Sequence, residues 1–325
     1  MLNKKHINYF KKILPKDFVF SDPGDCWAYG YDNSKMHVMP ECVLFADNKI
    51  QIQSIVSYCY ENDIPITTRG RGTGNTGGSV PIENSIVLSL EKMNKILKID
   101  INNRLAIVEP GVINKTLQDL LKKDNFFWGP DPSSQAYSTI GGNIANNSAG
   151  PRAIKYGTPR DNTLGLEFIS GKGEIHKTGV KTSKGVVGLD LTRLFIGSEG
   201  ILGILTEATL KIIPLNNSVK TIELTFESLE NASDMIIKLM TQPITPYKLE
   251  FIDEQAIKLI NTIKKNHYEQ DVKSALLLEI DGEDEYIDLM TNKLLKEINK
   301  NKYKKITIAE NKLEIEKLWS ARESL

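Results

Sequence analysis

The pattern of apolar and polar residues divides the chain into two regions. The first opens with an amphipathic helix at the N-terminus and contains a second such helix over 48–62. Apolar runs at 96–101 and 105–109 are expected to pair as a hairpin, and Gly171-Lys172-Gly173 predicts another tight hairpin further on. Short strands joined by glycine-rich loops therefore dominate this region.

Beyond Asn216-Asn217 the pattern becomes regular, and a helix is expected after each strand. The expected strands cover residues 219–227, 247–253, 274–281 and 304–309. This alternation predicts an α+β layer, in which an antiparallel sheet carries helices on one face. Because Pro214 and the two asparagines interrupt the pattern, we expect one domain over 1–215 and a second over 216–325.

Composition excludes several classes of protein. The 325 residues carry 41 Lys plus Arg and 41 Asp plus Glu, and no basic stripe marks a nucleic-acid binder. No apolar run approaches the roughly 20 residues of a transmembrane helix. Three cysteines, Cys26, Cys42 and Cys59, form no CxxC pair, a pattern typical of reduced thiols. We therefore expect a cytoplasmic protein without a transmembrane segment.

A loop over 69–78 is rich in glycine and matches GxGxxG from Gly72 to Gly77. Only residues 79–85, including Pro81, separate it from the next expected strand, whereas a βαβ crossover needs about 10–12 residues or more. A Rossmann fingerprint is therefore excluded. Successive N–H groups of such a loop can bind a pyrophosphate, and a flexible turn is the alternative.

Two further loops share this composition of glycine and small polar residues. One runs through Pro130-Asp131-Pro132-Ser133-Ser134 into Ile140-Gly141-Gly142-Asn143, and the other covers residues 197–203. Three such loops in one domain suggest exposed backbone amides that surround a long anionic ligand.

As a set, these motifs resemble the FAD-linked oxidases of the vanillyl-alcohol oxidase superfamily, in the branch of the glycolate oxidase D-subunit and D-lactate dehydrogenase. The resemblance also rests on three further motifs, Tyr31-Asp32-Asn33-Ser34, Lys155-Tyr156-Gly157 and Gly188-Leu189-Asp190-Leu191. The resemblance implies an α+β fold, with a two-part FAD-binding domain of the vanillyl-alcohol oxidase type followed by an incomplete ferredoxin-like cap domain.

By this resemblance, the glycine loop and the helix start at Gly141-Gly142-Asn143 would hold the pyrophosphate. Pro130, Asp131 and Ser134 would pass close to the flavin or ribityl chain, and Glu199 with the backbone near Ile204 would border the adenosine or flavin. For Glu199 a turn residue is the alternative. The full set at the cofactor is Arg69, Gly70, Arg71, Gly72, Thr73, Gly74, Asn75, Thr76, Pro130, Asp131, Ser134, Thr139, Gly141, Gly142, Asn143, Asn147, Gly150, Glu199, Gly200 and Ile204.

Two features of the glycine loop bear on how FAD is attached. Arg71 stands where the family usually has a small residue, so the loop is either more crowded or more attractive to phosphate. Because no histidine or cysteine lies between Thr67 and Val80, we expect FAD to be bound noncovalently.

Arg322 is the candidate catalytic residue. An arginine can engage a carboxylate through two parallel hydrogen bonds, and the segment 318–325 resembles the family segment whose arginine binds the substrate carboxylate. An exposed helix arginine paired with nearby acids is the alternative. The family's histidine motif is not in this sequence: His6, His37, His176 and His267 all lie in other settings, and no metal-ligand cluster is visible.

These features together predict FAD-dependent oxidation of a D-2-hydroxy acid such as glycolate or D-lactate, by hydride transfer to flavin N5. Electrons would then pass to a quinone, a cytochrome or a partner protein. The alternative is a flavin-binding subunit or inactive remnant that needs a partner chain, and a nonflavin nucleotide binder is a third reading. Because relatives continue past the arginine segment, we expect the N-terminal part of a longer enzyme. A truncated gene product, a partial sequence and one half of a split enzyme with a C-terminal complementing chain stay open as alternatives. The substrate, the acceptor and the oligomeric state stay open.

Overall fold

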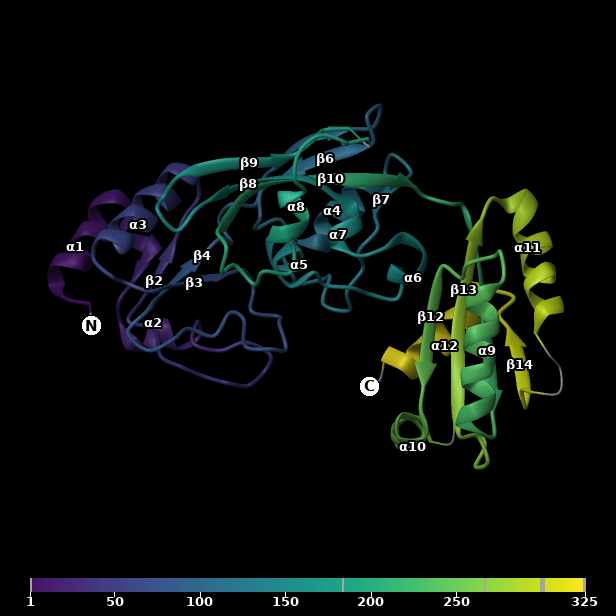
Figure 1. Cartoon of the computed structure of the whole chain (residues 1–325). Helices are drawn as coiled ribbons and strands as arrows, with labels where there is room; N and C mark the ends of the chain where they lie inside the picture. Colours follow the sequence, from purple (N-terminus) through teal and green to yellow (C-terminus); the bar gives the residue numbers. More distant parts are fainter. Residues whose placement is uncertain (1, 183, 266, 299–301, 324–325) are drawn as a thin grey trace. The chain divides into compact units, whose positions relative to one another are not determined.

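The computed structural model describes residues 2–182, 184–265, 267–298 and 302–323. The chain forms two compact units, one of residues 1–150 and 157–214 and the other of residues 151–156 and 215–325. None of the helices in the described ranges is long and apolar enough to cross a membrane. Figure 1 shows the elements of each unit.

The first unit begins with a four-stranded sheet in the order β1 (Val19–Phe20), β2 (Cys42–Phe45), β4 (Ile86–Ser89), β3 (Ile66–Arg69). Strands β2, β4 and β3 pair in parallel, and α1 (Lys4–Ile13) and α3 (Lys49–Glu61) contribute to the apolar core beside them. The parallel neighbours β3 and β4 are joined by residues 70–85, in which no helix forms. The sequence-based exclusion of a Rossmann crossover is therefore confirmed.

A second sheet in this unit has the order β5-β6-β10-β8-β9, and β7 also pairs with β10. All of these pairs are antiparallel, and both expected hairpins are present, β5 with β6 and β8 with β9. Helices α4 (Asn114–Lys122) and α5 (Ile140–Asn146) pack their apolar residues against it. The strands are β5 (Ile96–Asp100), β6 (Leu105–Val108), β7 (Phe126–Trp128), β8 (Thr163–Ile169), β9 (Ile175–Gly179) and β10 (Ile204–Pro214).

The short elements of the first unit were not predicted from the sequence. They include α2 (Pro23–Trp27), α7 (Pro159–Asn162) and α8 (Leu191–Phe195), the last of which interrupts a region expected to be strands alone. Each is too short to show an apolar periodicity, and side-chain caps fix two of them, through Asp22 for α2 and Asp190 for α8.

The second unit contains an antiparallel sheet in the order β12-β13-β11-β14. The expected alternation of strands and helices is confirmed throughout the described residues. In chain order the elements are β11 (Ser218–Phe226), α9 (Leu229–Thr241), β12 (Lys248–Ile252), α10 (Glu254–Ile263), β13 (Ser274–Gly282), α11 (Asp284–Glu297), β14 (Lys305–Ile308) and α12 (Lys312–Glu323), with α6 (Ala153–Tyr156) added from the earlier segment.

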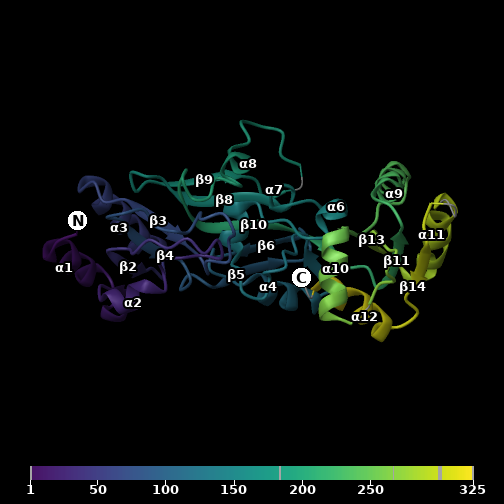
Figure 2. The same cartoon turned by 90° about the horizontal axis from the view of Figure 1, so that it is seen from below.

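The expectation that helices cover only one face of this sheet is wrong. Side chains alternate along β13: Leu276, Leu278 and Ile280 pack with α9 and α11, whereas Leu277 packs with Leu318 of α12. Figure 2 shows α9 and α11 on one side of the sheet and α10 and α12 on the other. Amphipathicity shows that a helix buries one face, but it does not show which side of the sheet receives it.

A buried carboxylate fastens the segment 151–156 to this sheet. Asp281 of β13 is only 4% exposed and accepts hydrogen bonds from Lys155, from the Tyr156 hydroxyl and from Asn216 Nδ2, the last at 2.7 Å. The pKa of Tyr156 is raised, mainly by burial and then by this carboxylate, so the phenol stays protonated and remains a donor. One carboxylate thus holds two separate stretches of chain.

Replacing Asp281 by alanine should therefore destabilise the second unit by about 3 kcal/mol, because Lys155 would be left without its anionic partner. Urea unfolding followed by tryptophan fluorescence measures this loss. Glu254→Ala is the matched control, since Glu254 pairs with Lys258 and Lys273 at the surface and its removal should leave the midpoint unchanged. Equal midpoints for both variants would show that Asp281 does not stabilise the unit.

Candidate functional site

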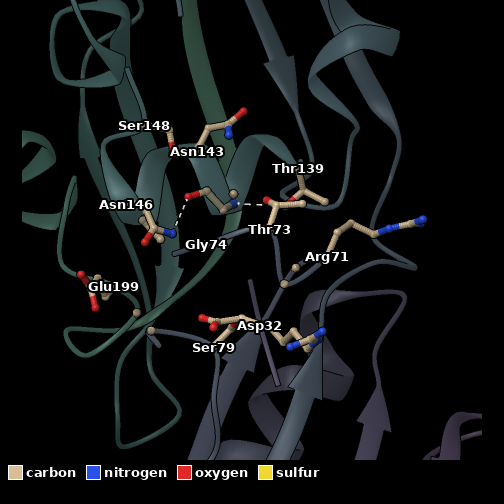
Figure 3. Close-up of a pocket in the computed structure, with 18 of the residues that line it drawn as sticks. Asp32, Arg71, Thr73, Gly74, Ser79, Thr139, Asn143, Asn146, Ser148 and Glu199 are labelled. Atoms are coloured by element: carbon tan, nitrogen blue, oxygen red, sulfur yellow. Dashed lines mark hydrogen bonds between the residues drawn. The ribbon is translucent and has the colours of Figure 1, made fainter. Parts of the chain in front are cut away.

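A pocket of about 360 Å³ lies in the first unit, between the β3–β4 loop, α5 and the turn before β10. Figure 3 shows Gly74 near Asn146, with Thr139 on one side of the view and Glu199 on the other. The pocket brings together most of the residues proposed from the sequence, namely Arg69, Gly70, Arg71, Gly72, Thr73, Gly74, Asn75, Thr76, Ser134, Thr139, Gly141, Gly142, Asn143, Glu199 and Gly200.

The glycine loop presents backbone N–H groups without a hydrogen-bond acceptor among the described residues. Within the part of the chain that the structure describes, the N–H groups of residues 72–76 donate to no protein acceptor. Gly72 has a φ of +65°, and a Cβ there would lie 2.2 Å from Nη2 of Arg69, so the turn requires glycine. Unpaired N–H groups in a turn of this kind form a concavity that attracts anionic oxygen atoms.

The loop is held in place by the residues that precede β2. The backbone N–H of Asn33 donates to the Gly74 carbonyl at 3.0 Å, and Asn33 Nδ2 donates to Asn75 Oδ1. Arg69 Nη1 donates to the Tyr31 carbonyl at 2.6 Å. Burial lowers the pKa of Arg69, while the nearby Glu91 raises it. These contacts keep the loop rigid although its own amides are unpaired.

Arg71 is turned toward an acidic partner. Its Nη1 lies 3.1 Å from Glu91 Oε2, and about half of its side chain is exposed. The Arg71 guanidinium therefore has an anionic partner in Glu91, while the residue itself lines the pocket.

The first turn of α5 differs from the glycine loop because protein acceptors already occupy its amides. Thr139 caps the helix and accepts from Gly142 N at 3.2 Å through its hydroxyl, and from Asn143 N through its carbonyl. Gly141 N donates to the Pro110 carbonyl at 2.8 Å. The start of α5 thus contributes the positive end of its helix dipole to the pocket wall. The glycine loop contributes the unpaired N–H donors.

Asn143 is oriented by a residue that the sequence did not single out. Asn114 is fully buried at the start of α4, and its Nδ2 donates to Asn143 Oδ1 at 2.9 Å and to the Pro130 carbonyl at 3.3 Å. Because the Asn143 oxygen is occupied, its amide N–H₂ group remains for the pocket, which Asn143 lines. In the sequence, the only indication of this role was an asparagine at the start of a helix.

Glu199 combines a turn conformation with a place in the pocket wall. Its φ is +52°, and its N–H donates to the Ala145 carbonyl at the end of α5. A Cβ on Gly78 would lie 2.9 Å from Glu199 Oε2, so glycine at 78 lets the carboxylate approach the loop. Both readings of Glu199 from the sequence, a turn residue and a pocket residue, describe its geometry.

Five of the proposed residues support the pocket without lining it: Pro130, Asp131, Asn147, Gly150 and Ile204. Asn147 has a φ of +47° at the end of α5, and its Oδ1 accepts from Arg160 N at 3.1 Å. A Cβ on Gly150 would lie 2.0 Å from the Asp131 carbonyl, so these two segments pass in direct contact. Pocket residues that the sequence proposal omitted include Asp32, Ser79, Asn146 and Ser148.

Arg322 lies on α12 in the second unit. Its Nε donates to Glu250 Oε2 at 3.0 Å, and its side chain is 39% exposed. The pairing with a nearby acid that the sequence left as an alternative is therefore present, although the acid is Glu250 of β12. A partner at Nε leaves the terminal Nη groups as donors for a further anion.

The histidines lie apart from the pocket. His6 contacts the Tyr58 hydroxyl, His176 contacts Glu174, and burial lowers the pKa of His267, which packs edge-on against Tyr268. His37 stacks beside Trp27 in a neighbouring hollow. Among the residues whose placement is described, no group of three His, Cys, Asp or Glu side chains could hold a metal ion.

The comparison with known families agrees with this geometry. The family described as "FAD binding domain" matches residues 40–179, and the family described as "FAD linked oxidases, C-terminal domain" matches residues 215–325. A fold with two sheets around a glycine-loop pocket, followed by an antiparallel α+β unit, thus defines an FAD-binding protein. The chain belongs to the FAD-linked oxidase family, and its cofactor is FAD.

Two curated proteins with similar sequences are a glycolate oxidase subunit and a D-lactate dehydrogenase. Glycolate oxidase subunit GlcD of Bacillus subtilis (strain 168) is 40% identical over 84% of this chain and 58% of its own length. D-lactate dehydrogenase of Anaerostipes hadrus is 36% identical over 77% of this chain and 53% of its own length. The chain therefore spans rather more than half the length of these relatives.

Solved structures share the fold at low sequence identity. Alkyldihydroxyacetonephosphate synthase superposes with a TM-score of 0.81 at 19% identity, covering 98% of this chain and 68% of the other. p-Cresol methylhydroxylase gives a TM-score of 0.80 at 20% identity, covering 94% and 65%. Identities this low establish the fold alone.

Replacing Asn114 by alanine should lower the free energy of unfolding by about 1–3 kcal/mol, because Asn143 Oδ1 and the Pro130 carbonyl would lose a buried donor. Chemical denaturation of the purified variant measures this loss. Asn114→Asp keeps the shape but removes the donor and adds a charge, so it should be at least as unstable. Wild-type stability in both variants would contradict the assigned orientation of Asn143.

Proposed function

We propose that the chain is the FAD-binding and substrate-binding part of a dehydrogenase or oxidase that acts on a D-2-hydroxy acid. Glycolate and D-lactate are the leading substrates, since relatives named for each align with most of this chain. The observation that carries the proposal is the pocket wall of unpaired loop amides at 72–76, which suits the pyrophosphate of FAD. Bound FAD supplies the hydride acceptor for the reaction.

Each wall of the pocket has a proposed part in holding FAD. The glycine loop binds the pyrophosphate, with Thr73, Asn75 and Thr76 as side-chain donors. The α5 start lies beside the same phosphates, where the helix dipole favours negative charge and Asn143 adds an amide donor. Ser134 borders the ribityl chain or the flavin, and Glu199 with Gly200 borders the adenosine or the flavin. FAD is held noncovalently, because no histidine or cysteine lies between Thr67 and Val80.

Arg322 is proposed to bind the substrate carboxylate. The ion pair with Glu250 fixes the guanidinium through Nε, and the terminal Nη groups can then engage a carboxylate bidentately. Binding of this kind positions the substrate, and it leaves removal of the hydroxyl proton to another group.

A second candidate is a flavin-binding subunit that turns over only with a complementing chain. The name of its B. subtilis relative, which identifies that relative as a subunit, favours this candidate. An electron acceptor, whether a quinone, a cytochrome or a partner protein, belongs to both candidates. The three buried free cysteines suit a reducing compartment, and we propose the cytoplasm.

Anaerobic reduction of the bound flavin separates the two candidates. The purified chain, loaded with FAD, is mixed with glycolate, D-lactate or L-lactate, and the visible flavin absorbance is followed. Bleaching by a D-2-hydroxy acid but not by L-lactate supports an active dehydrogenase. Bleaching only after the C-terminal part of a relative is added supports the subunit, and bleaching by none of these substrates in either setting refutes the 2-hydroxy acid proposal.

Replacing Gly74 by valine should abolish FAD binding while the fold is retained. A Cβ at 74 would meet only Asp32 at 3.8 Å and Asn146 at 3.9 Å, so the valine is accommodated but its side chain fills the space beside the loop amides. Flavin absorbance per chain measures occupancy, and thermal unfolding measures the fold. Gly171→Val, with nothing within 4 Å, is the matched control and should retain FAD. Full occupancy in Gly74→Val would refute the placement of the phosphates.

Replacing Arg322 by lysine should lower kcat/KM for the 2-hydroxy acid by about tenfold or more, because lysine cannot form the paired hydrogen bonds of a guanidinium. The assay supplies the complementing part where turnover requires it, and FAD content should stay at the wild-type level. Arg193→Lys is the control, since Arg193 pairs with Asp190 at the surface of the first unit. Equal kcat/KM values for Arg322→Lys and wild type would remove Arg322 from the site.

A further inference from the structure

A second hollow adjoins the FAD pocket, and aromatic side chains form much of its wall. Its volume is about 590 Å³, and it shares Asp32, Gly72, Thr73 and Ser134 with the pocket. The other residues around it are Trp27, Tyr31, Asn33, Lys35 and His37. All of them belong to the first unit. The proposed function uses none of these last five side chains.

The aromatic rings lie close together and are unusually exposed. Trp27 is 55% exposed and Tyr31 is 40% exposed. The ring centroids of Trp27 and Tyr31 are 5.5 Å apart with planes tilted by 52°, and those of Trp27 and His37 are 5.2 Å apart with planes tilted by 31°. The planes of Tyr31 and His37 are 29° apart. Large aromatic surfaces left open at a hollow are typical of a binding site for a flat apolar ligand.

The turn that carries these rings is built into the wall of the FAD pocket. Tyr31 and His37 form an antiparallel bridge, and Asp32 Oδ1 accepts from Ser34 N at 2.9 Å inside the turn. The Tyr31 carbonyl accepts from Arg69, and the Asn33 N–H donates to the Gly74 carbonyl. The rings are therefore fixed relative to the loop that we assign to the pyrophosphate, and they do not belong to a freely moving surface loop.

We propose that this hollow binds a quinone, which accepts electrons from reduced FAD; the inference rests on the proposed function. A quinone ring is flat and neutral, so it can stack on Trp27 with its edge against the tilted Tyr31 ring. Lys35 can donate a hydrogen bond to a quinone carbonyl oxygen, whereas Nε2 of His37 already lies 3.2 Å from the Trp27 carbonyl. The quinone takes two electrons and two protons and leaves as the hydroquinone, and reduced FAD returns to its oxidised form. The shared wall at Gly72, Thr73 and Ser134 brings acceptor and cofactor sites together.

The charge around the hollow favours a quinone over a nucleotide. Lys35 is the only lysine or arginine among the described residues that line it, and Asp32 adds a carboxylate. The unpaired N–H groups of Gly72 and Thr73 on this wall are assigned to the pyrophosphate of FAD, so Lys35 is the cationic donor left for a second phosphate-bearing ligand. The remaining competitor is a ring of FAD itself, and the experiment below distinguishes it.

Menadione, a naphthoquinone, is the probe. The FAD-loaded chain is photoreduced under anaerobic conditions and mixed with menadione in a stopped-flow instrument, so no 2-hydroxy acid is needed. Trp27→Ala and Tyr31→Ala should each raise the apparent Kd for menadione about tenfold. Trp27→Phe, which keeps a ring, should stay close to wild type. Tyr286→Ala, which removes an exposed ring from the second unit, is the matched control.

Three results would overturn the inference. Unchanged menadione reoxidation in both alanine variants would show that the hollow is not the acceptor site. Loss of FAD or a shifted flavin spectrum in those variants would assign the rings to FAD. Equal slowing with ferricyanide, which has no ring to stack, would indicate a general defect. If the chain binds no FAD, the proposed function is refuted independently of the hollow. The hollow is then tested by comparing how strongly menadione quenches the tryptophan fluorescence of the wild type and of Trp27→Phe.

Discussion

The structure depends on one constraint: a loop must leave its backbone donors unpaired for a ligand and still hold a single shape. The β3–β4 loop meets this constraint through contacts made by its carbonyls and side chains, because its N–H groups at 72–76 take no protein acceptor in the described chain. Asn33 binds the Gly74 carbonyl, and the Arg69 guanidinium packs against Gly72 and binds the Tyr31 carbonyl. Residues 72–76 are half-buried or exposed, so water can satisfy these N–H groups, and a ligand with many acceptor atoms can replace that water.

In the second unit the main constraint is different, because buried carboxylates on the sheet need partners. Asp281 binds Lys155, Tyr156 and Asn216, and on the same strand Glu279 receives hydrogen bonds from Thr221 and an ion pair from Lys248. Each carboxylate has more than one partner, so burial is offset by hydrogen bonds. Lys155 and Tyr156 follow closely on Ser148 and Ala149 of the FAD pocket, so one short segment serves both units.

Much of the fold could be predicted because its signals are local. Long strands and helices of the second unit show clear apolar periodicity, and the β8–β9 hairpin carries a glycine turn at Gly171-Lys172-Gly173. Short helices such as α8 contain too few residues to show an apolar periodicity. The position of α12, on the sheet face opposite α9 and α11, depends on tertiary packing that a local sequence pattern does not contain. The family resemblance predicted the loops of the pocket. It included Asn33 in the motif at 31–34 without giving it a role, and it did not single out Asn114, because the contacts of both residues join segments far apart in the sequence.

The sequence also could not distinguish between the two elements that we propose face the phosphates of FAD. Both the glycine loop and the start of α5 read as anion sites, yet the α5 amides already donate to Pro110 and Thr139 while the loop amides do not. Hydrogen–deuterium exchange with and without FAD tests this difference most directly. We predict that FAD strongly slows exchange at residues 72–76 and changes it little at 141–143. Protection at 141–143 with none at the glycine loop would contradict the assignment of the loop as the phosphate site.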